Sequence, residues 1–398
     1  MKRLLPALVL AVAAPAAAAW TFTAATAVSG EPAVGVFPHL EPTGRRALAV
    51  DGDSVAITWE DNRSGAPQAY MALKPAASAG FNPPLRLSSG KEAYEPTIIA
   101  FAGGFVAAWE QDGGLRMRAI TAHGPGPVTP LGGARAAQVT LHAAAGRLFA
   151  AWVEREGRFG RVMVAPLMLS GETLHTGKAV PADGVPPQDQ QLYPALAHTG
   201  DELVVAWEDR RAGHTRLHYA CSALHPLRFG TPVPLNEHPT VENAEFGRGG
   251  GVTRVALAAD DGRLAAVWMD KRDFQGGYDT YSAMFGNDCR FGSNEKVQDM
   301  FGENTPQWHP AVAVAADGTT VAVWDDTRDG SPDLWLSTRG EDGWSDDLAV
   351  TPAHGPGRQD NPALAFDHRG RLHLAWLHAS EGGPVRVMYS VATRALTD

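Results

Sequence analysis

Cysteine is nearly absent from this chain: Cys221 and Cys289 are the only two among 398 residues. Two thiols cannot by themselves provide the four ligands of a structural zinc site. In an oxidising compartment an isolated pair is instead a candidate disulfide. We therefore predict a Cys221–Cys289 bridge, with two small buried thiols as the alternative.

Clusters of basic residues are also missing. The chain has 34 Lys and Arg against 44 Asp and Glu, and no Lys/Arg-rich run occurs. Nucleic-acid binding depends on clustered cations that displace counterions from the phosphate backbone. The composition therefore excludes nucleic acid as a partner.

A long hydrophobic run occurs only at the start, in MKRLLPALVLAVAAPAAAAW. Lys2 and Arg3 form a basic segment, Leu4 to Ala13 an apolar core, and the alanines at 17–19 a small-residue cleavage signature. This pattern predicts a secretory signal peptide over residues 1–19, because the apolar core is too short to span a membrane. We expect residues 20–398 to form a single exported domain, periplasmic or secreted, that is monomeric and has no membrane span.

A tryptophan-centred repeat runs through the rest of the chain, as in VVAWEDRR at 204–211. Its copies lie 43 to 61 residues apart, and repeats with a period of roughly 20 to 50 residues are typical of solenoids and propellers. Seven copies cover everything after residue 19, and they are centred on Trp59, Trp109, Trp152, Trp207, Trp268, Trp324 and Trp376.

Each copy contains four short apolar or aromatic runs separated by Gly, Pro or charged turns. In the fourth copy these runs are YPALAHTG (193–200), ELVVAW (202–207), TRLHYACS (215–222) and FGTPVPLNE (229–237). Four short strands per repeat indicate a propeller blade. A second strand that is apolar on both faces fits a sheet covered by neighbouring blades. We therefore predict an all-β, seven-bladed β-propeller with four-stranded antiparallel blades.

The two ends of the chain predict how the ring closes. The seventh copy stops at Asp398 without a fourth strand, whereas WTFTAATAVS at 20–29 resembles a fourth strand that lacks its own blade. An N-terminal strand that completes the last blade would remove both exposed sheet edges. We predict this closure.

An Asp and an Arg two residues apart follow the Trp in four copies, which suggests a structural role. Function rarely requires one site four times, so we interpret these pairs as braces of the turn that ends the second strand. The pairs are Asp61-Arg63, Asp209-Arg211, Asp270-Arg272 and Asp326-Arg328.

The spacing of the third and fourth strands resembles the Asp-box (BNR) motif S-x-D-x-G-x-x-W of sialidase-like β-propellers. Ser222 and Phe229 stand seven apart, as do Ser337 and Trp344, but Leu224 and Pro226, or Arg339 and Glu341, occupy the Asp and Gly positions. The resemblance implies a propeller fold. No segment matches the arginine triad, the Tyr/Glu nucleophile pair or the acid Asp of true sialidases, so the resemblance assigns no catalytic residue.

Polar residues recur at two positions that a propeller presents around the mouth of its central channel. The residue entering the first strand is Arg45, Glu95, Gln138, Tyr193, Thr253, His309 or Asn361, and the second strands end in acids. Loops on a rigid scaffold are where binding usually resides. The predicted ligand-binding residues are Arg45, Glu95, Tyr193, Glu208, Asp270, His309, Asp325 and Asn361.

The acidic mouth has three interpretations. The carboxylates are solvated turns neutralised by neighbouring arginines, or they bind a hard cation such as Ca²⁺, or two of them act as acid and base on a glycoside. Histidines entering the blades are a further candidate, for Cu or Zn, although no H-x-x-x-H or H-x-H spacing supports it. These are His39, His238, His309 and His354.

No motif of a serine hydrolase, a Cys–His enzyme or a zinc protease occurs. The sequence therefore favours an exported, non-catalytic propeller that binds a ligand or a protein partner on its acidic channel-mouth face. The alternative is a sialidase-like glycoside hydrolase, or another carbohydrate-active enzyme, that uses the rim carboxylates.

Overall fold

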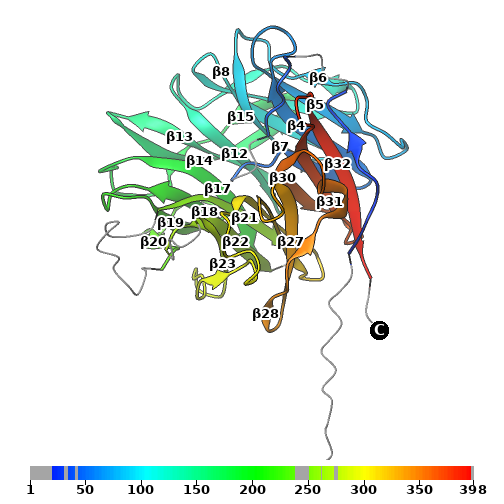
Figure 1. Cartoon of the computed structure of the whole chain (residues 1–398). Coiled ribbons are helices and arrows are strands. Elements are labelled where there is room, and N and C mark those ends of the chain that lie inside the picture. Colours follow the sequence, from blue (N-terminus) through cyan, green and yellow to red (C-terminus); the bar gives the residue numbers. More distant parts are fainter. Residues whose placement is uncertain are drawn as a thin grey trace, which may run out of the picture.

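The computed structural model describes residues 20–30, 35–40, 44–237, 251–260, 262–272 and 277–395. These residues form seven antiparallel sheets arranged around a common axis, as predicted (Figure 1). The predicted signal peptide, residues 1–19, and His238 lie outside the described residues. Within the described ranges no helix is long and apolar enough to cross a membrane.

The strands of each blade follow one another from the axis to the outside, and the first strands of neighbouring blades contact each other around the channel. Blades 1 to 3 comprise β3 (Leu48–Asp51), β4 (Ser54–Asp61), β5 (Gln68–Lys74) and β6 (Leu85–Arg86); β7 (Ala93–Phe101), β8 (Gly104–Gln111), β9 (Gly114–Thr121), β10 (Gly124–Pro125) and β11 (Thr129–Leu131); and β12 (Ala137–Ala144), β13 (Arg147–Glu156), β14 (Phe159–Ser170), β15 (Thr173–Thr176) and β16 (Val180–Pro181).

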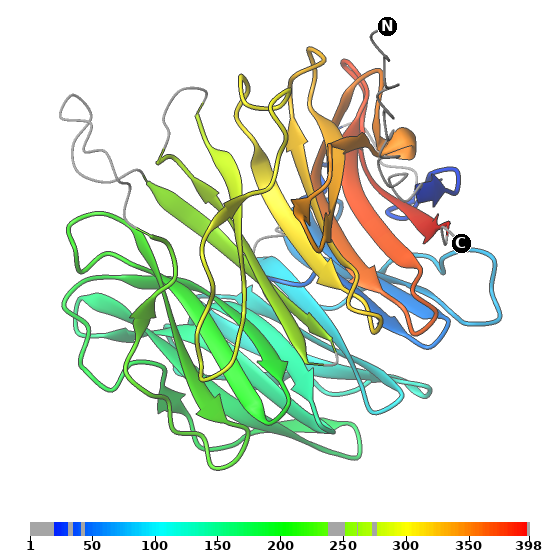
Figure 2. The same cartoon turned by 90° about the horizontal axis from the view of Figure 1, so that it is seen from below.

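Blades 4 to 7 continue the same order, and Figure 2 shows their strands side by side. They comprise β17 (Gln191–Thr199), β18 (Glu202–Asp209), β19 (Arg216–Ala223) and β20 (Val233–Pro234); β21 (Val252–Asp260), β22 (Arg263–Asp270), β23 (Asp279–Met284) and β24 (Glu295–Lys296); β25 (Trp308–Val314), β26 (Thr320–Asp326), β27 (Asp333–Gly340), β28 (Gly343–Trp344) and β29 (Leu348–Ala349), followed by the 3-10 turn η1 (Thr351–Ala353); and β30 (Arg358–Phe366), β31 (Leu372–Ala379) and β32 (Val385–Arg394).

The core is divided into layers between adjacent blades, and the second strand of each blade contributes to the layers on both of its faces. This is why these strands read as continuous apolar runs in the sequence. The tryptophan that ends each run is 0 to 2% exposed in all seven copies. The repeated Trp is therefore a packing residue between blades.

The N-terminal segment closes the ring, which confirms the predicted closure. β1 (Trp20–Phe22) and β2 (Thr26–Ala27) both pair with β32, the third strand of blade 7. Trp20 also donates its indole N–H to Thr338 Oγ1 of blade 6 at 3.0 Å. Residues 20–27 thus join the last blade to its neighbour.

The four Asp–Arg pairs brace turns, as the repetition suggested. In blade 1, Asp61 accepts the indole N–H of Trp59 at 2.7 Å and the Arg63 Nη2 at 2.5 Å. Asp209, Asp270 and Asp326 make the same contacts to the Trp two residues before and the Arg two residues after. One carboxylate therefore satisfies the buried indole and fixes the turn.

A disulfide joins Cys221, on β19, to Cys289, which follows β23 in the next blade, with the two Cα atoms 6.1 Å apart. The bridge closes a loop with a sequence separation of 68 residues. In the chain-entropy model a loop of this length stabilises the fold by a few kcal/mol.

We expect the Cys221→Ser/Cys289→Ser double variant to unfold at lower denaturant concentration with a somewhat larger m-value, because the unfolded chain without the bridge is less compact and exposes more surface. Intact mass should show the purified wild-type protein two hydrogens lighter than its reduced form. Two titratable thiols in the native protein would contradict the bridge.

Candidate ligand-binding site at the channel mouth

A bulge recurs in the first strand of six blades and shapes the mouth of the channel. The pairing register shifts by one residue near the start of β7, β12, β17, β21, β25 and β30. Bulges re-aim side chains, and a non-glycine residue with positive φ is uncommon. Here the bulge residue has φ between 49° and 63° in every case: Glu95, Gln138, Tyr193, Arg254, His309 and Asn361.

Acids at the ends of the second strands hold four of these bulges in place. Glu60 Oε2 accepts the backbone N–H of Glu95 at 2.6 Å, and Glu110 Oε1 accepts that of Gln138 at 2.7 Å. Glu208 and Asp325 do the same for Arg254 and Asn361, at 2.8 and 3.1 Å. Each acid therefore links its blade to the next one and satisfies an N–H that the bulge removes from the ladder.

The structure places seven of the eight predicted site residues at the mouth and separates Asp270 from them. Asp270 is 1% exposed and holds Trp268 and Arg272, so it belongs to the brace. Its neighbour Met269 occupies the mouth position in blade 5. Adjacent residues of a strand point to opposite faces, so a shift of one position changes the environment completely.

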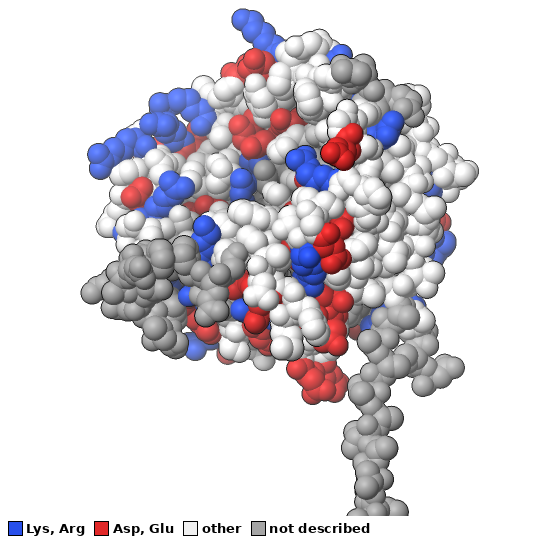
Figure 3. Space-filling view, in the orientation of Figure 1, with Lys and Arg blue, Asp and Glu red and all other residues white. Residues whose placement is uncertain are grey.

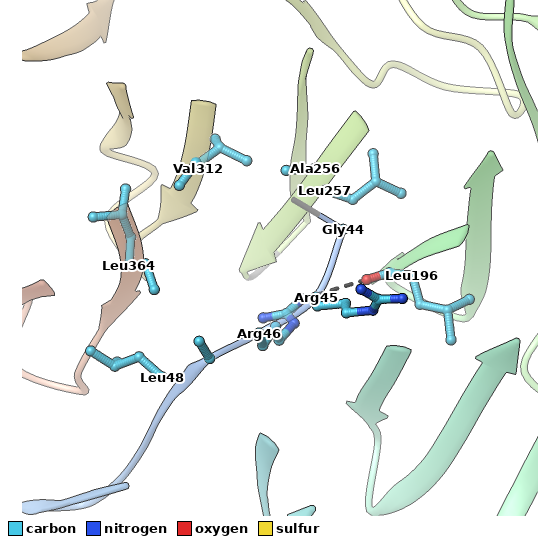
Figure 4. A pocket seen from close by; sticks show the side chains of 12 residues that line it. Gly44, Arg45, Arg46, Leu48, Leu196, Ala256, Leu257, Val312 and Leu364 are labelled. Carbon is cyan, nitrogen blue, oxygen red and sulfur yellow. Dashed lines mark hydrogen bonds between the residues drawn. The ribbon is translucent and has the colours of Figure 1, made fainter. Parts of the chain in front are cut away.

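The segment Gly44–Arg46, which we call the plug, crosses the channel beneath the mouth. A Cβ on Gly44 would lie 3.1 Å from the Val255 carbonyl oxygen and 3.3 Å from that of Pro194, so blades 4 and 5 touch its backbone directly. Arg46 Nη2 reaches the Leu196 carbonyl oxygen at 3.5 Å (Figure 4). Only about 40 Å³ of water-accessible space remains among the surrounding strands. The mouth is therefore a bowl with a floor.

A histidine pair anchors the plug from below. Arg46 Nη2 lies 3.3 Å from His142 Nδ1, and His142 Nε2 lies 2.8 Å from His198 Nδ1. Burial, followed by the positive charge of Arg46, lowers the pKa of both imidazoles. These contacts require the imidazole rings of His142 and His198 to be neutral, because a proton on His142 Nδ1 would point at the positively charged guanidinium of Arg46.

Three glutamates surround Arg45 at the acidic side of the bowl. The Arg45 side chain is 3% exposed, forms an ion pair with Glu95 and lies 3.6 Å from Glu110 Oε1. Glu60 is joined to the same group through the backbone of Glu95. The carboxyl side chains remain 17 to 29% exposed, so they are accessible from the mouth.

Burial raises the pKa of Glu60 and of Glu110 above the ordinary value, and the negative charge of Glu95 raises both further. Contacts with backbone N–H groups and with Arg45 oppose this shift without cancelling it. A single guanidinium thus faces three carboxyl groups. Such an arrangement favours a proton on one carboxyl group beside an ionised one.

A second acidic group lies where blades 6 and 7 meet. His309 Nδ1 is 2.8 Å from Asp325 Oδ1, and burial raises the pKa of Asp325. Burial, with the charge of Asp325, raises the pKa of Asp360 to about 6. Asp360 Oδ1 is buried without a hydrogen-bond partner. Asn361 donates to the Leu40 carbonyl oxygen at 2.8 Å and ties this group to the entry of blade 1.

The structure does not bring the candidate metal ligands together among the described residues. His39 lies 4.0 Å from Glu60, His309 contacts Asp325, and His354 lies 3.4 Å from Asp329. Within the described ranges, one group of three candidate ligands has its atoms within 4.8 Å of one another: Glu202 with the two disulfide-bonded cysteines. Binding of Ca²⁺, Cu or Zn stays a prediction.

Four residues at the mouth were not among the ligand-binding residues predicted from the sequence: Glu60, Glu110, Arg254 and Asp360. Glu60 and Glu110 occupy the same repeat position as Glu208 and Asp325, so alignment of the repeats was a sufficient signal for them. The alignment points to Thr253 in blade 5, one residue before the bulge at Arg254. The burial that raises the Asp360 pKa leaves no sequence pattern.

Comparison with known proteins gives the fold. No family model and no curated protein matches the chain. An ulvan lyase of a new polysaccharide lyase family is similar with a TM-score of 0.58 and 12% identity over 92% of this chain and 94% of its own. An α-L-arabinofuranosidase from Fusarium graminearum gives 0.52 and 12% over 90% and 98%, and the β-propeller domain of the Trilobed protease from Pyrococcus furiosus gives 0.52 and 10% over 91% and 98%. The chain therefore shares its β-propeller fold with two carbohydrate-active enzymes and with the propeller domain of a protease.

Proposed function

We propose that the channel mouth binds a carbohydrate and that its carboxyl groups cleave a glycosidic bond by acid–base chemistry. One observation carries this proposal: three glutamates, Glu60, Glu95 and Glu110, gather around one buried guanidinium, that of Arg45. The pKa values of Glu60 and Glu110 are both raised. A protonated carboxyl group beside an ionised one is the arrangement that glycoside cleavage uses.

In this proposal Glu110 is the proton donor. Its carboxyl proton passes to the glycosidic oxygen as the bond from that oxygen to the anomeric carbon breaks, and a water molecule supplies the hydroxyl group to the anomeric carbon. A second carboxylate, about 5 to 9.5 Å from the donor, activates the water or attacks the carbon directly. Glu60 and Asp360 are the candidates at the mouth. Arg45 pairs with Glu95, and the negative charge of Glu95 raises the pKa of Glu110, which helps to retain the proton on Glu110.

Replacement of Glu110 by Gln tests the proposal. Gln keeps an oxygen for the Gln138 N–H but has no proton to donate, so we expect turnover to fall by about 10²- to 10⁴-fold with little change in affinity. Wild-type activity should be lost as the pH rises through the raised pKa of Glu110, because the acid form is then depleted. The assay is product detection by mass spectrometry with arabino- and galacturono-oligosaccharides.

Glu154→Gln is the matched control. Glu154 accepts the Trp152 indole N–H and the Gly133 N–H in a brace position, so its loss should leave turnover unchanged. Equal turnover by Glu110→Gln and the wild type would contradict the assigned role. Binding without any product from the wild type would contradict catalysis.

Non-catalytic binding is the second candidate, and one observation favours it. In each of four mouth acids, one carboxylate oxygen already accepts a backbone N–H of the next blade. These acids are Glu60, Glu110, Glu208 and Asp325. In that case these acids shape a rigid bowl, and ligand hydroxyl groups bind to the remaining oxygens. The same experiment distinguishes the two candidates, since only the enzyme releases a product.

We also propose that the protein is exported to the periplasm or secreted, in keeping with the N-terminal sequence and the disulfide. The spacing of the degenerate Asp boxes supports descent from sialidase-like propellers. Peptide sequencing of the protein from the culture medium or the periplasm would show whether it begins near Trp20.

A further inference from the structure

The side of the mouth formed by blades 4, 5 and 6 differs in chemistry from the glutamate side. It carries a row of aromatic rings and cations that we call the aromatic–basic wall: Tyr193, Arg254, Lys271, Tyr278 and Trp308. Arg254 lies over the Tyr193 ring at 4.4 Å, and Lys271 over the Tyr278 ring at 4.2 Å. Tyr278 and Trp308 meet edge to face at 5.4 Å, so Trp308 extends the Lys271–Tyr278 pair.

The wall is rigidly built. Arg254 is the bulge residue of blade 5, and its backbone N–H is held by Glu208. The Lys271 N–H donates to the Gly251 carbonyl oxygen at 2.9 Å, and the Gln307 N–H donates to that of Tyr278 at 2.7 Å. Cations stacked on rings are pre-organised, so a ligand that binds them loses less side-chain freedom.

Trp308 is the exposed element of the wall. Its relative exposure is 38%, whereas the seven repeat tryptophans are 0 to 2% exposed. It directly precedes His309 at the mouth and does not fill space between blades. An open indole face beside hydrogen-bonding groups is a surface on which a sugar ring can stack.

Charge divides the bowl. The glutamate side holds Glu60, Glu95 and Glu110 around Arg45, and Asp325 and Asp360 form the second acidic group at the junction of blades 6 and 7. The cations Arg254 and Lys271 lie on the wall, where Glu208 accepts the Arg254 N–H. Burial raises the pKa of Glu208, and its contacts with Thr253 and Arg254 partly oppose the shift. Basic and acidic side chains both gather around the hollow at the centre of this face (Figure 3).

We propose that the aromatic–basic wall is a subsite for an anionic sugar, whose carboxylate or sulfate group binds Arg254 and Lys271 while its ring stacks on Trp308. The inference rests on the proposed function of the mouth and names its substrate class. An anionic group on the glutamate side would face three carboxyl groups, so charge fixes the orientation of the sugar in the bowl.

Calorimetric titration with three probes tests the proposal: trigalacturonate, a sulfated galacto-oligosaccharide and neutral galactotriose. We expect both acidic probes to bind at least about tenfold more tightly than the neutral one, and their affinity to fall with added salt. Arg254→Met should lower the ratio of acidic-probe affinity to neutral-probe affinity by about tenfold. Trp308→Ala should weaken the binding of all three probes. If only one acidic probe binds, its anionic group is identified and the subsite is supported.

Arg158→Met is the matched control, because Arg158 lies 4.6 Å over the Phe159 ring on blade 3, outside the wall, and its loss should change no affinity. Equal affinity for neutral and acidic probes, or an unchanged acidic preference in Arg254→Met, would overturn the subsite. Cleavage of galactotriose without that preference would refute the subsite and leave the proposed function standing. Arg254-dependent binding of the acids without cleavage would support the subsite and refute catalysis.

Discussion

Deletion of residues 20–29 is expected to abolish cooperative unfolding. The deletion removes both strands that pair with β32 and exposes the edge of blade 7. It also removes Trp20, which is 8% exposed, and Ser29, whose hydroxyl group accepts the Val387 N–H at 3.1 Å and whose carbonyl oxygen accepts from Arg63 of blade 1. The ring then has an open joint, and an unpaired edge favours aggregation. Thermal unfolding followed by circular dichroism measures the effect.

The point variant Trp20→Ala provides a milder form of the same experiment. Burial of a large aromatic ring contributes about 3–5 kcal/mol, so this variant should remain folded with a clearly lower melting temperature. The chain of residues 20–398, which is the predicted mature protein, is the control. If the deletion variant melts at the same temperature as this control, strands β1 and β2 do not close the ring.

Asp270→Ala is expected to lower stability by about 3–5 kcal/mol without a direct effect on ligand affinity. The substitution removes the acceptor for the Trp268 indole N–H at 3.0 Å and for Arg272 Nη2 at 2.6 Å, and the Asp270 side chain is 1% exposed. Removing one partner of a buried ion pair leaves an uncompensated charge. Urea unfolding measures the loss, and titration with an oligosaccharide below the transition measures affinity.

Glu156→Ala supplies the comparison. Glu156 also pairs with an arginine, Arg161, at 2.6 Å, but its side chain is 47% exposed. An exposed pair contributes at most about 1 kcal/mol. Weaker binding by Asp270→Ala at unchanged stability would return Asp270 to the ligand site and contradict its role as a brace.

The sequence by itself determined the architecture. Seven tryptophans at blade spacing, apolar second strands and a last repeat without its fourth strand were enough to predict the ring and its closure. The prediction succeeded because both are consequences of local periodicity: a strand buried on both faces must be apolar throughout, and a missing strand must come from elsewhere in the chain. The repeated Asp–Arg pairs were likewise understood from their repetition.

Only the tertiary structure decided what the mouth can do. The bulge of blade 5 selects Arg254 over Thr253, because a one-residue change of register moves a side chain to the other face. Asp270 is separated from Glu208 and Asp325 because it stands one position later in its strand, at the buried position of Asp209 and Asp326. The grouping of three glutamates around Arg45 joins residues from two blades and the plug. Burial and neighbouring charge set the pKa values of these groups, and both depend on how the blades pack. Sequence periodicity contains no information about that packing across the channel.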